Sequence, residues 1–164
     1  MKKIKNICSI RNILCFLLVL LVYFVPLVFL KVNKIHYESL KTLPIPFGVY
    51  KASFFLIGVF TALIVCLFKP HFKEKEDKLI RYGVRRFILY LILNFLFLIA
   101  LIATFFQAQN LFLTYVLALS GLITSLFILM EAILIKKAKA WWTVPLLLWH
   151  LLLTVSSIFI FLYN

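Results

Sequence analysis

Asn94, Glu131, Trp149 and His150 place polar atoms inside long apolar runs of this sequence. A polar group costs free energy in hydrocarbon, so each such residue indicates either a structural hydrogen bond or a contact with a ligand. Both interpretations of Asn94 stay open: an interhelical hydrogen bond to a Ser or Thr side chain, or a polar contact with a ligand. We expect His150 to be a neutral packing residue that makes a hydrogen bond, and Trp149 to pack against protein or ligand.

No set of residues in the sequence predicts catalysis. The apolar runs contain no pair of carboxylates, and the 4 glycines of the chain exclude Gly-rich phosphate loops. The three histidines lie far apart and do not predict a shared metal site. Glu131 precedes Lys136 and Lys137 by about one turn of helix, and we expect it to reach them at the membrane surface. The protein is therefore not expected to be an enzyme.

Charge and cysteine content exclude two further classes of protein. The net charge is +13, but the basic residues occupy short segments between apolar runs and form no soluble face that could bind nucleic acid. The cysteines are Cys8, Cys15 and Cys66, an odd number without a C-x-x-C pair, which argues against a disulfide framework and a zinc site. We expect them to act as small hydrophobic residues.

The apolar runs that must position these residues predict membrane-spanning helices. Of the 164 residues, 65% are apolar and 14% are charged, whereas soluble domains are about half apolar and about a quarter charged. A transmembrane helix needs about 20 residues. We predict an all-α integral membrane protein, a single five-helix bundle over residues 1–164. Its transmembrane helices are predicted over residues 13–30, 49–68, 87–106, 111–135 and 141–163.

Local signals add detail to this bundle. The short connection 107–110 makes the third and fourth helices antiparallel neighbours, and the long connection 31–51 is of a length that often carries function. Gly121 and Ser125 lie four residues apart and allow close helix packing. Pro145 lies early in the fifth predicted helix, where its missing N–H predicts a kink.

The distribution of Lys and Arg predicts the topology. The N-terminal segment, residues 69–86 and residues 136–140 hold fourteen of these residues on one side of the bundle, and residues 31–51 hold the other four. Positive charge marks the cytoplasmic face of a membrane protein. We expect a multi-pass membrane protein with the N-terminus in the cytoplasm and the C-terminus outside. The Lys- and Ile-rich composition suggests a bacterial cytoplasmic membrane.

Residues 36–164 carry a pattern of motifs on the predicted helices and in the long first connection. The motifs are Leu93-Asn94-Phe95-Leu96-Phe97, Pro145 and Leu148-Trp149, together with the loop segment His36-Tyr37-Glu38-Ser39-Leu40. This pattern resembles the TspO/MBR family (translocator protein / tryptophan-rich sensory protein). The loop segment is similar to the family's Trp-Tyr-x-x-Leu motif, with His36 in place of Trp. Five helices, a long first loop and a short third loop agree with the resemblance.

The resemblance implies a ligand cavity among the five helices, closed by the first loop. In that family the cavity accepts porphyrins, haem and sterol-like molecules, so the implied ligand is a tetrapyrrole, either porphyrin or haem, and no cofactor is required. Leu151 and Leu153 stand where the family has small residues and are expected to narrow the pocket. The implied ligand-binding residues are Tyr37 in the lid, Asn94 as a polar anchor, and Phe55, Phe97 and Trp149 as walls.

The implied function is binding of a hydrophobic or amphipathic small molecule in the bilayer, as a sensor, carrier or scavenger. Homodimers occur in the family, so a homodimer is also implied. Two alternatives stay open. One is a structural or accessory membrane subunit that kept the fold and lost the ligand, which the aliphatic substitutions in the pocket favour. The other is a porphyrin-degrading enzyme, for which the sequence offers no acid, base or metal set.

Overall fold

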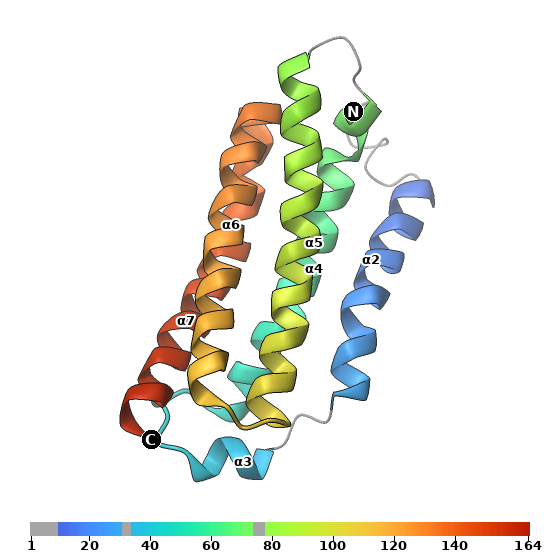
Figure 1. The fold of residues 1–164 in the computed structure, drawn as a ribbon. Helices are drawn as coiled ribbons and strands as arrows, with labels where there is room; N and C mark the ends of the chain where they lie inside the picture. The colour runs from blue at the N-terminus through green and yellow to red at the C-terminus, as the bar shows by residue number, and fades with distance from the viewer. Residues whose placement is uncertain (1–9, 31–33, 74–77) are drawn as a thin grey trace.

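The computed structural model describes residues 10–30, 34–73 and 78–164, and all regular structure in these ranges is helical. Five long helices lie side by side in an elongated bundle (Figure 1). They are α2 (Ile10–Phe29), α4 (Phe47–Phe68), α5 (Lys78–Phe106), α6 (Leu111–Ala140) and α7 (Val144–Tyr163). The short helices are α3 (Lys34–Ser39), η1 (Lys69–Lys73) and η2 (Trp141–Thr143). The predicted all-α architecture with five long helices is confirmed.

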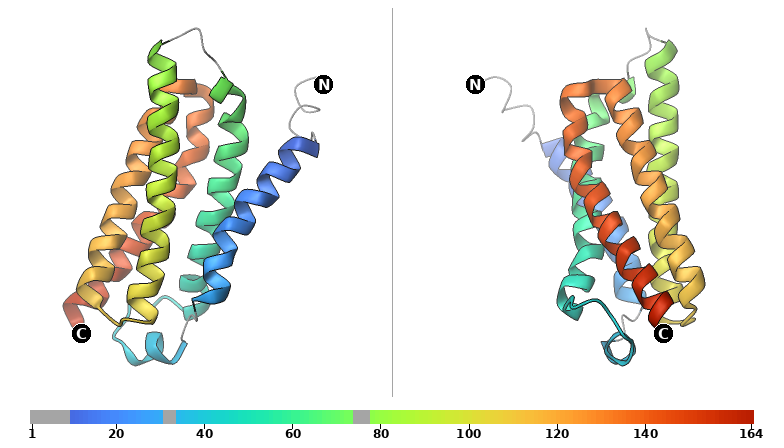
Figure 2. Two further views of the ribbon diagram at one scale, coloured as in Figure 1. Left: turned by 45° about the vertical axis from the view of Figure 1, so that its right-hand side comes forward. Right: turned by 90° about the vertical axis from the view of Figure 1, so that its left-hand side faces the viewer.

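The long helices run alternately up and down the bundle, so their connections gather at two ends (Figure 1). We call these the η1 end, which also holds η2, and the α3 end, which also holds the turn between α5 and α6. Along the bundle α5 packs on α6, α6 on α7, and α7 on α4. Helix α2 lies at the periphery, where it packs chiefly on α4 (Figure 2).

Three helical stretches are long and apolar enough, by length and composition, to cross a membrane: Phe47–Phe68, Leu79–Phe106 and Leu111–Tyr163. The third contains both α6 and α7, and Asn12–Val25 in α2 forms a shorter apolar helix. Large apolar side chains also cover the outer faces, as on α2, where Leu14 is 60% exposed. The described bundle is therefore apolar on its outer faces as well as in its interior, which is typical of a membrane protein.

Helix α5 begins earlier than the sequence analysis predicted, at Lys78 rather than at residue 87. Its 29 residues span about 43 Å at 1.5 Å per residue, more than the hydrocarbon thickness of about 30 Å. Arg81, Arg85 and Arg86 therefore lie on helical turns at the η1 end and not in a loop. The predicted helix began only after the last of these charged residues. Arg is a good helix former, however, so charged residues do not end a helix. They limit only the part of the helix that lies in hydrocarbon.

The segment between α6 and α7 also differs from the prediction. Lys136 has non-helical dihedrals (φ −160°, ψ 89°), so the regular part of α6 ends at Ile135, as predicted, and a further short helical stretch leads to η2. The prediction of a kink at Pro145 is wrong. Pro145 lies in the first turn of α7, where an amide has no acceptor within the helix, so the missing N–H costs no hydrogen bond.

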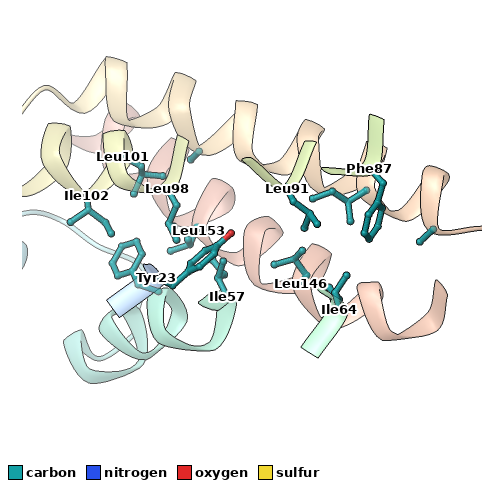
Figure 3. Packing of buried hydrophobic residues seen from close by; sticks show 14 of the residues in the cluster. Tyr23, Ile57, Ile64, Phe87, Leu91, Leu98, Leu101, Ile102, Leu146 and Leu153 are labelled. Atoms are coloured by element: carbon teal, nitrogen blue, oxygen red, sulfur yellow. The ribbon is translucent and has the colours of Figure 1, made fainter. Parts of the chain in front are cut away.

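The core lies between α4, α5 and α7, with Tyr23 of α2 inserted from the periphery. Figure 3 shows the Tyr23 ring among Ile57, Leu98 and Leu153, with its hydroxyl pointing into the bundle. Leu153 is fully buried and packs in this part of the core. Leu151, which with Leu153 was expected to narrow the pocket, is exposed on the outer face of α7 because it lies two residues away on the helix.

Candidate functional site

Asn94 lies fully buried on α5, at the centre of a hydrogen-bond network that joins three helices. Its Nδ2 donates to the carbonyl oxygen of Gly121 (3.1 Å) and to Oγ1 of Thr124 (3.1 Å), both on α6. Its Oδ1 lies 3.1 Å from Nε2 of His150 on α7. Because the amide oxygen can only accept, His150 Nε2 donates. We call Asn94, Gly121, Thr124 and His150 the Asn94 network.

Every polar group of the Asn94 side chain is therefore satisfied by protein atoms. A primary amide offers two N–H donors and one carbonyl acceptor, and these meet Gly121, Thr124 and His150 respectively. The hydrogen bond expected for His150 is present, and the interhelical bond from Asn94 to a Thr side chain is present too. In this conformation the network cross-links α5, α6 and α7.

A second group of buried side chains lies at the α3 end, where α3, α4 and α5 meet. The ring of Tyr50 is centred 4.9 Å from that of Tyr37, 5.3 Å from Phe54 and 5.6 Å from Phe105. Edge-on and tilted ring contacts of this kind are favourable, and these rings are almost completely buried. We call the following residues the Tyr50 cluster: Tyr37, Phe47, Tyr50, Phe54, Phe105 and Phe106.

Two hydroxyl groups are buried against the Tyr50 cluster without hydrogen bonds to the described part of the chain. They belong to Tyr50 on α4 and Ser157 on α7, which are 1% and 3% exposed. The Tyr50 hydroxyl has the Ser157 hydroxyl as its side-chain hydrogen-bonding partner, although their geometry falls short of a full hydrogen bond. Each hydroxyl has one donor and two acceptor lone pairs, so a weak bond between the two leaves hydrogen-bonding capacity for a further polar atom beside them.

Residues 34–46, which comprise α3 and the turn after it, form the covering segment of the Tyr50 cluster and are fastened at two points. The Tyr37 hydroxyl donates to the carbonyl oxygen of Ile45 (2.9 Å), which closes the turn after α3. Asn164, at the C-terminal cap of α7, accepts from Lys41 N (2.8 Å) and donates to Lys41 O (3.0 Å). Burial raises the pKa of Tyr37 above its ordinary value, so the phenol stays a donor at neutral pH. A few hydrogen bonds thus hold the covering segment.

The predicted ligand-binding residues fall in different places. Tyr37 belongs to the Tyr50 cluster, and Asn94 lies in its own network. Phe55 is 41% exposed, and its ring packs 4.9 Å from that of Phe24 on α2. Phe97 is half-buried on α5, and Trp149 is half-buried and packs against the core.

Sequence analysis did not identify the Tyr50–Ser157 pair. Tyr50 stands among apolar residues at the start of α4, and Ser157 lies in the apolar run of α7, so neither has a distinguishing neighbour in the sequence. One signal was present in the sequence. Both hydroxyls lie in predicted membrane spans, at the end of the bundle next to the long first connection. Only the packing of α4 against α7 brings the two groups together.

Glu131 pairs with a different cation from the one predicted. Its carboxylate accepts from Nε of Arg86 (2.8 Å) and from a terminal guanidinium nitrogen of the same residue (3.3 Å), which joins α6 to α5. Lys136 and Lys137 are not its partners in these contacts, because the backbone departs from the helix at Lys136. A Cβ atom on Gly83 would lie 3.3 Å from the carboxylate, so this glycine leaves room for the pair.

Within the described ranges no group of three or more His, Cys, Asp or Glu side chains is placed to hold a metal ion. No family model matches the chain, and no curated protein sequence matches it. Fold and composition therefore define the class: an all-helical bundle whose long apolar helices have the length and composition of membrane spans. The resemblance to the TspO/MBR family stays a prediction.

Proposed function

We propose that this protein is a multi-pass integral membrane protein that binds a hydrophobic or amphipathic small molecule at the α3 end of its bundle. Large apolar side chains on the outer faces of α2, α5, α6 and α7 support the first part, because lipid is the solvent that suits them. Basic residues gather at the η1 end, which we assign to the cytoplasm. The exposed Trp141 and Trp142 at that end fit an interfacial position.

The observation that carries the ligand proposal is the buried Tyr50–Ser157 hydroxyl pair against aromatic rings. Small-molecule sites combine mostly apolar and aromatic walls with a few polar groups that fix orientation. Hydroxyls donate to carboxylate, carbonyl or ether oxygens, and aromatic edges and faces suit a flat apolar ring system. The ligand class is thus a flat, largely apolar molecule with an oxygen substituent, and a tetrapyrrole such as porphyrin or haem belongs to it.

Entry to this site requires the covering segment to move. Tyr37 packs directly on Tyr50, so a ligand must displace the Tyr37 ring to reach the hydroxyls. The bonds from Tyr37 to Ile45 and from Asn164 to Lys41 are few and lie at the end of the bundle. Net hydrogen-bond contributions are about 1 kcal/mol each, which a ligand can offset. We assign Tyr37 the role of a lid residue, as the family resemblance implied.

The test is a titration of the purified protein in detergent with protoporphyrin IX and with haem, followed by tryptophan fluorescence. Saturable quenching is expected, and Tyr50→Phe and Ser157→Ala are each expected to weaken binding by about tenfold, the loss of one hydrogen bond of about 1.4 kcal/mol. Ser156→Ala is the matched control, since the Ser156 hydroxyl donates to Leu152 O of its own helix (2.8 Å).

Two outcomes would contradict the ligand proposal. The first is the absence of saturable quenching in a protein whose helical circular dichroism is intact. The second is equal affinity for the wild type and the Tyr50→Phe and Ser157→Ala variants, which would place any bound ligand elsewhere.

A structural or accessory membrane subunit is the second candidate function. The closed Asn94 network favours it, because the predicted polar anchor is already saturated by Gly121, Thr124 and His150. This candidate predicts a partner protein that co-purifies in stoichiometric amount from native membranes, together with no binding of either tetrapyrrole. Tetrapyrrole binding without such a partner would contradict it.

A further inference from the structure

Cys15 and Cys66 come together across the contact between α2 and α4. The thiol of Cys66 donates to the carbonyl oxygen of Asn12 on α2 (3.5 Å), and Asn12 lies one helical turn before Cys15. A helical side chain points back towards the preceding turn, so the Cys15 side chain lies beside Asn12 O and hence beside the Cys66 thiol, with which it interacts electrostatically. Both residues are free cysteines, and both are half-buried. From the sequence the two were expected to be unrelated small hydrophobic residues, but the fold makes them a pair.

The pair lies towards the η1 end of the bundle. Cys66 is in the last turn of α4, directly before η1, and Cys15 is in the second turn of α2. Both residues are partly exposed, so a small oxidant can approach the pair.

We infer that Cys15 and Cys66 form a redox-active dithiol, which a peroxide oxidises to a disulfide that joins α2 to α4. The position of the Cys66 thiol 3.5 Å from Asn12 O, one helical turn from Cys15, carries this inference. It is independent of any ligand at the α3 end.

The reaction balances with hydrogen peroxide as the oxidant. One thiol, as its thiolate, attacks a peroxide oxygen; the O–O bond breaks, and a sulfenic acid and one water molecule form. The second thiol then attacks the sulfenic sulfur; the S–S bond forms, the S–O bond breaks, and a second water molecule leaves. The two sulfur atoms together lose two electrons, which the peroxide gains. A low-molecular-weight thiol reverses the reaction by thiol–disulfide exchange.

The position of α2 gives this chemistry a structural consequence. Helix α2 lies at the edge of the bundle and packs chiefly on α4, so few other contacts fix it (Figure 2). A covalent bond between Cys15 and Cys66 holds the η1 end of α2 against α4. Reduction leaves that end attached by apolar packing and by the weak Cys66–Asn12 hydrogen bond. Disulfides at a reducing cytoplasmic face are transient, as expected for a switch.

The test uses the full chain with Cys8→Ser, which leaves only the two cysteines of the pair. The purified protein is treated with hydrogen peroxide, the remaining thiols are blocked with N-ethylmaleimide, and peptides are mapped by mass spectrometry. We expect a peptide with Cys15 linked to a peptide with Cys66, in monomeric protein, and full recovery of both thiols with dithiothreitol.

The matched control, also with Cys8→Ser, carries Leu14→Cys together with Cys15→Ser. It keeps two cysteines, but position 14 points outward, since Leu14 is exposed on the outer face of α2. Because proximity sets the rate of the second step, the natural pair should form its intramolecular disulfide at least about tenfold faster than the control. Equal rates, the absence of a linked peptide, or links only between two chains would overturn the inference.

Discussion

The imidazole ring of His150 lies directly against Gly121, so that a Cβ atom at position 121 would stand 3.0 Å from Nδ1 of the ring. The other ring nitrogen lies 3.1 Å from Oδ1 of Asn94. The ring therefore cannot move away from α6 without straining its bond to α5. Because Gly121 of α6 has no side chain, α7 can approach α6 closely enough for His150 to reach Asn94 on α5.

Gly121→Ala should destabilise the protein. In a helix interior this change normally stabilises by up to about 1 kcal/mol, but here the new methyl group displaces a buried, hydrogen-bonded ring, and overpacking costs about 1–3 kcal/mol. We expect a lower temperature of unfolding in detergent, followed by circular dichroism. Gly48→Ala is the matched control, because nothing lies within 4 Å of its Cβ position. Equal stability of the two variants would mean that His150 moves freely.

Asn94 and His150 should be coupled in a double-mutant cycle. Each residue loses a buried partner when the other is replaced, whereas removal of both leaves no unpaired group between them. For Asn94→Ala and His150→Ala we expect a coupling free energy of about 0.5–2 kcal/mol, the range for polar pairs in membrane proteins. Reversible unfolding of the two single variants and the double variant measures it. Strict additivity would show that their 3.1 Å contact contributes nothing.

The ion pair of Arg86 and Glu131 should contribute more to stability than the exposed pair of Lys34 and Glu38. The Glu131 side chain is 8% exposed, so Arg86→Ala leaves a nearly buried carboxylate with fewer donors and should cost about 1–3 kcal/mol. Lys34 and Glu38 are 64% and 55% exposed, and Lys34→Ala should cost less than about 0.5 kcal/mol. Chemical denaturation of both variants compares them, and similar losses would contradict this ranking.

Tyr37 should ionise at a higher pH than an exposed tyrosine. Burial raises its folded-state pKa above the ordinary value of 10.0, so as the pH rises through 10 the unfolded chain loses this proton before the folded protein does. Folding stability then falls with rising pH. The ultraviolet phenolate difference spectrum between wild type and Tyr37→Phe reports this residue. Ionisation of Tyr37 at its ordinary pKa would mean that the covering segment is open in solution.

The two ends of the bundle should be accessible from opposite sides of the membrane. In a variant with all three cysteines replaced by Ser, Glu38→Cys at the α3 end should react with a membrane-impermeant maleimide in intact cells. Lys137→Cys at the η1 end should react only after permeabilisation, because the positive residues mark the cytoplasmic side. The reverse labelling pattern would invert the topology, and labelling of both from one side would exclude a five-span arrangement.

The sequence by itself determined that the chain is a bundle of five apolar helices. The lengths of the apolar runs and the residues that separate them are local properties, and they set the end of the regular part of α6 and the tight turn between α5 and α6. The length of the apolar run gave the wrong N-terminus for α5, because a helix extends beyond its apolar part when the adjoining residues are good helix formers. The local sequence also gave the wrong result at Pro145, whose effect depends on its position within the helix.

Only the tertiary structure decided which side chains meet. A helix that is apolar on nearly all faces gives no periodic signal of how it is rotated about its axis. The sequence therefore indicated that Asn94 needs partners but not that Gly121, Thr124 and His150 supply them. The same holds for Arg86 with Glu131, for Tyr50 with Ser157 and for Cys15 with Cys66. Each pair joins two helices, and only helix packing fixes their relative rotation and height.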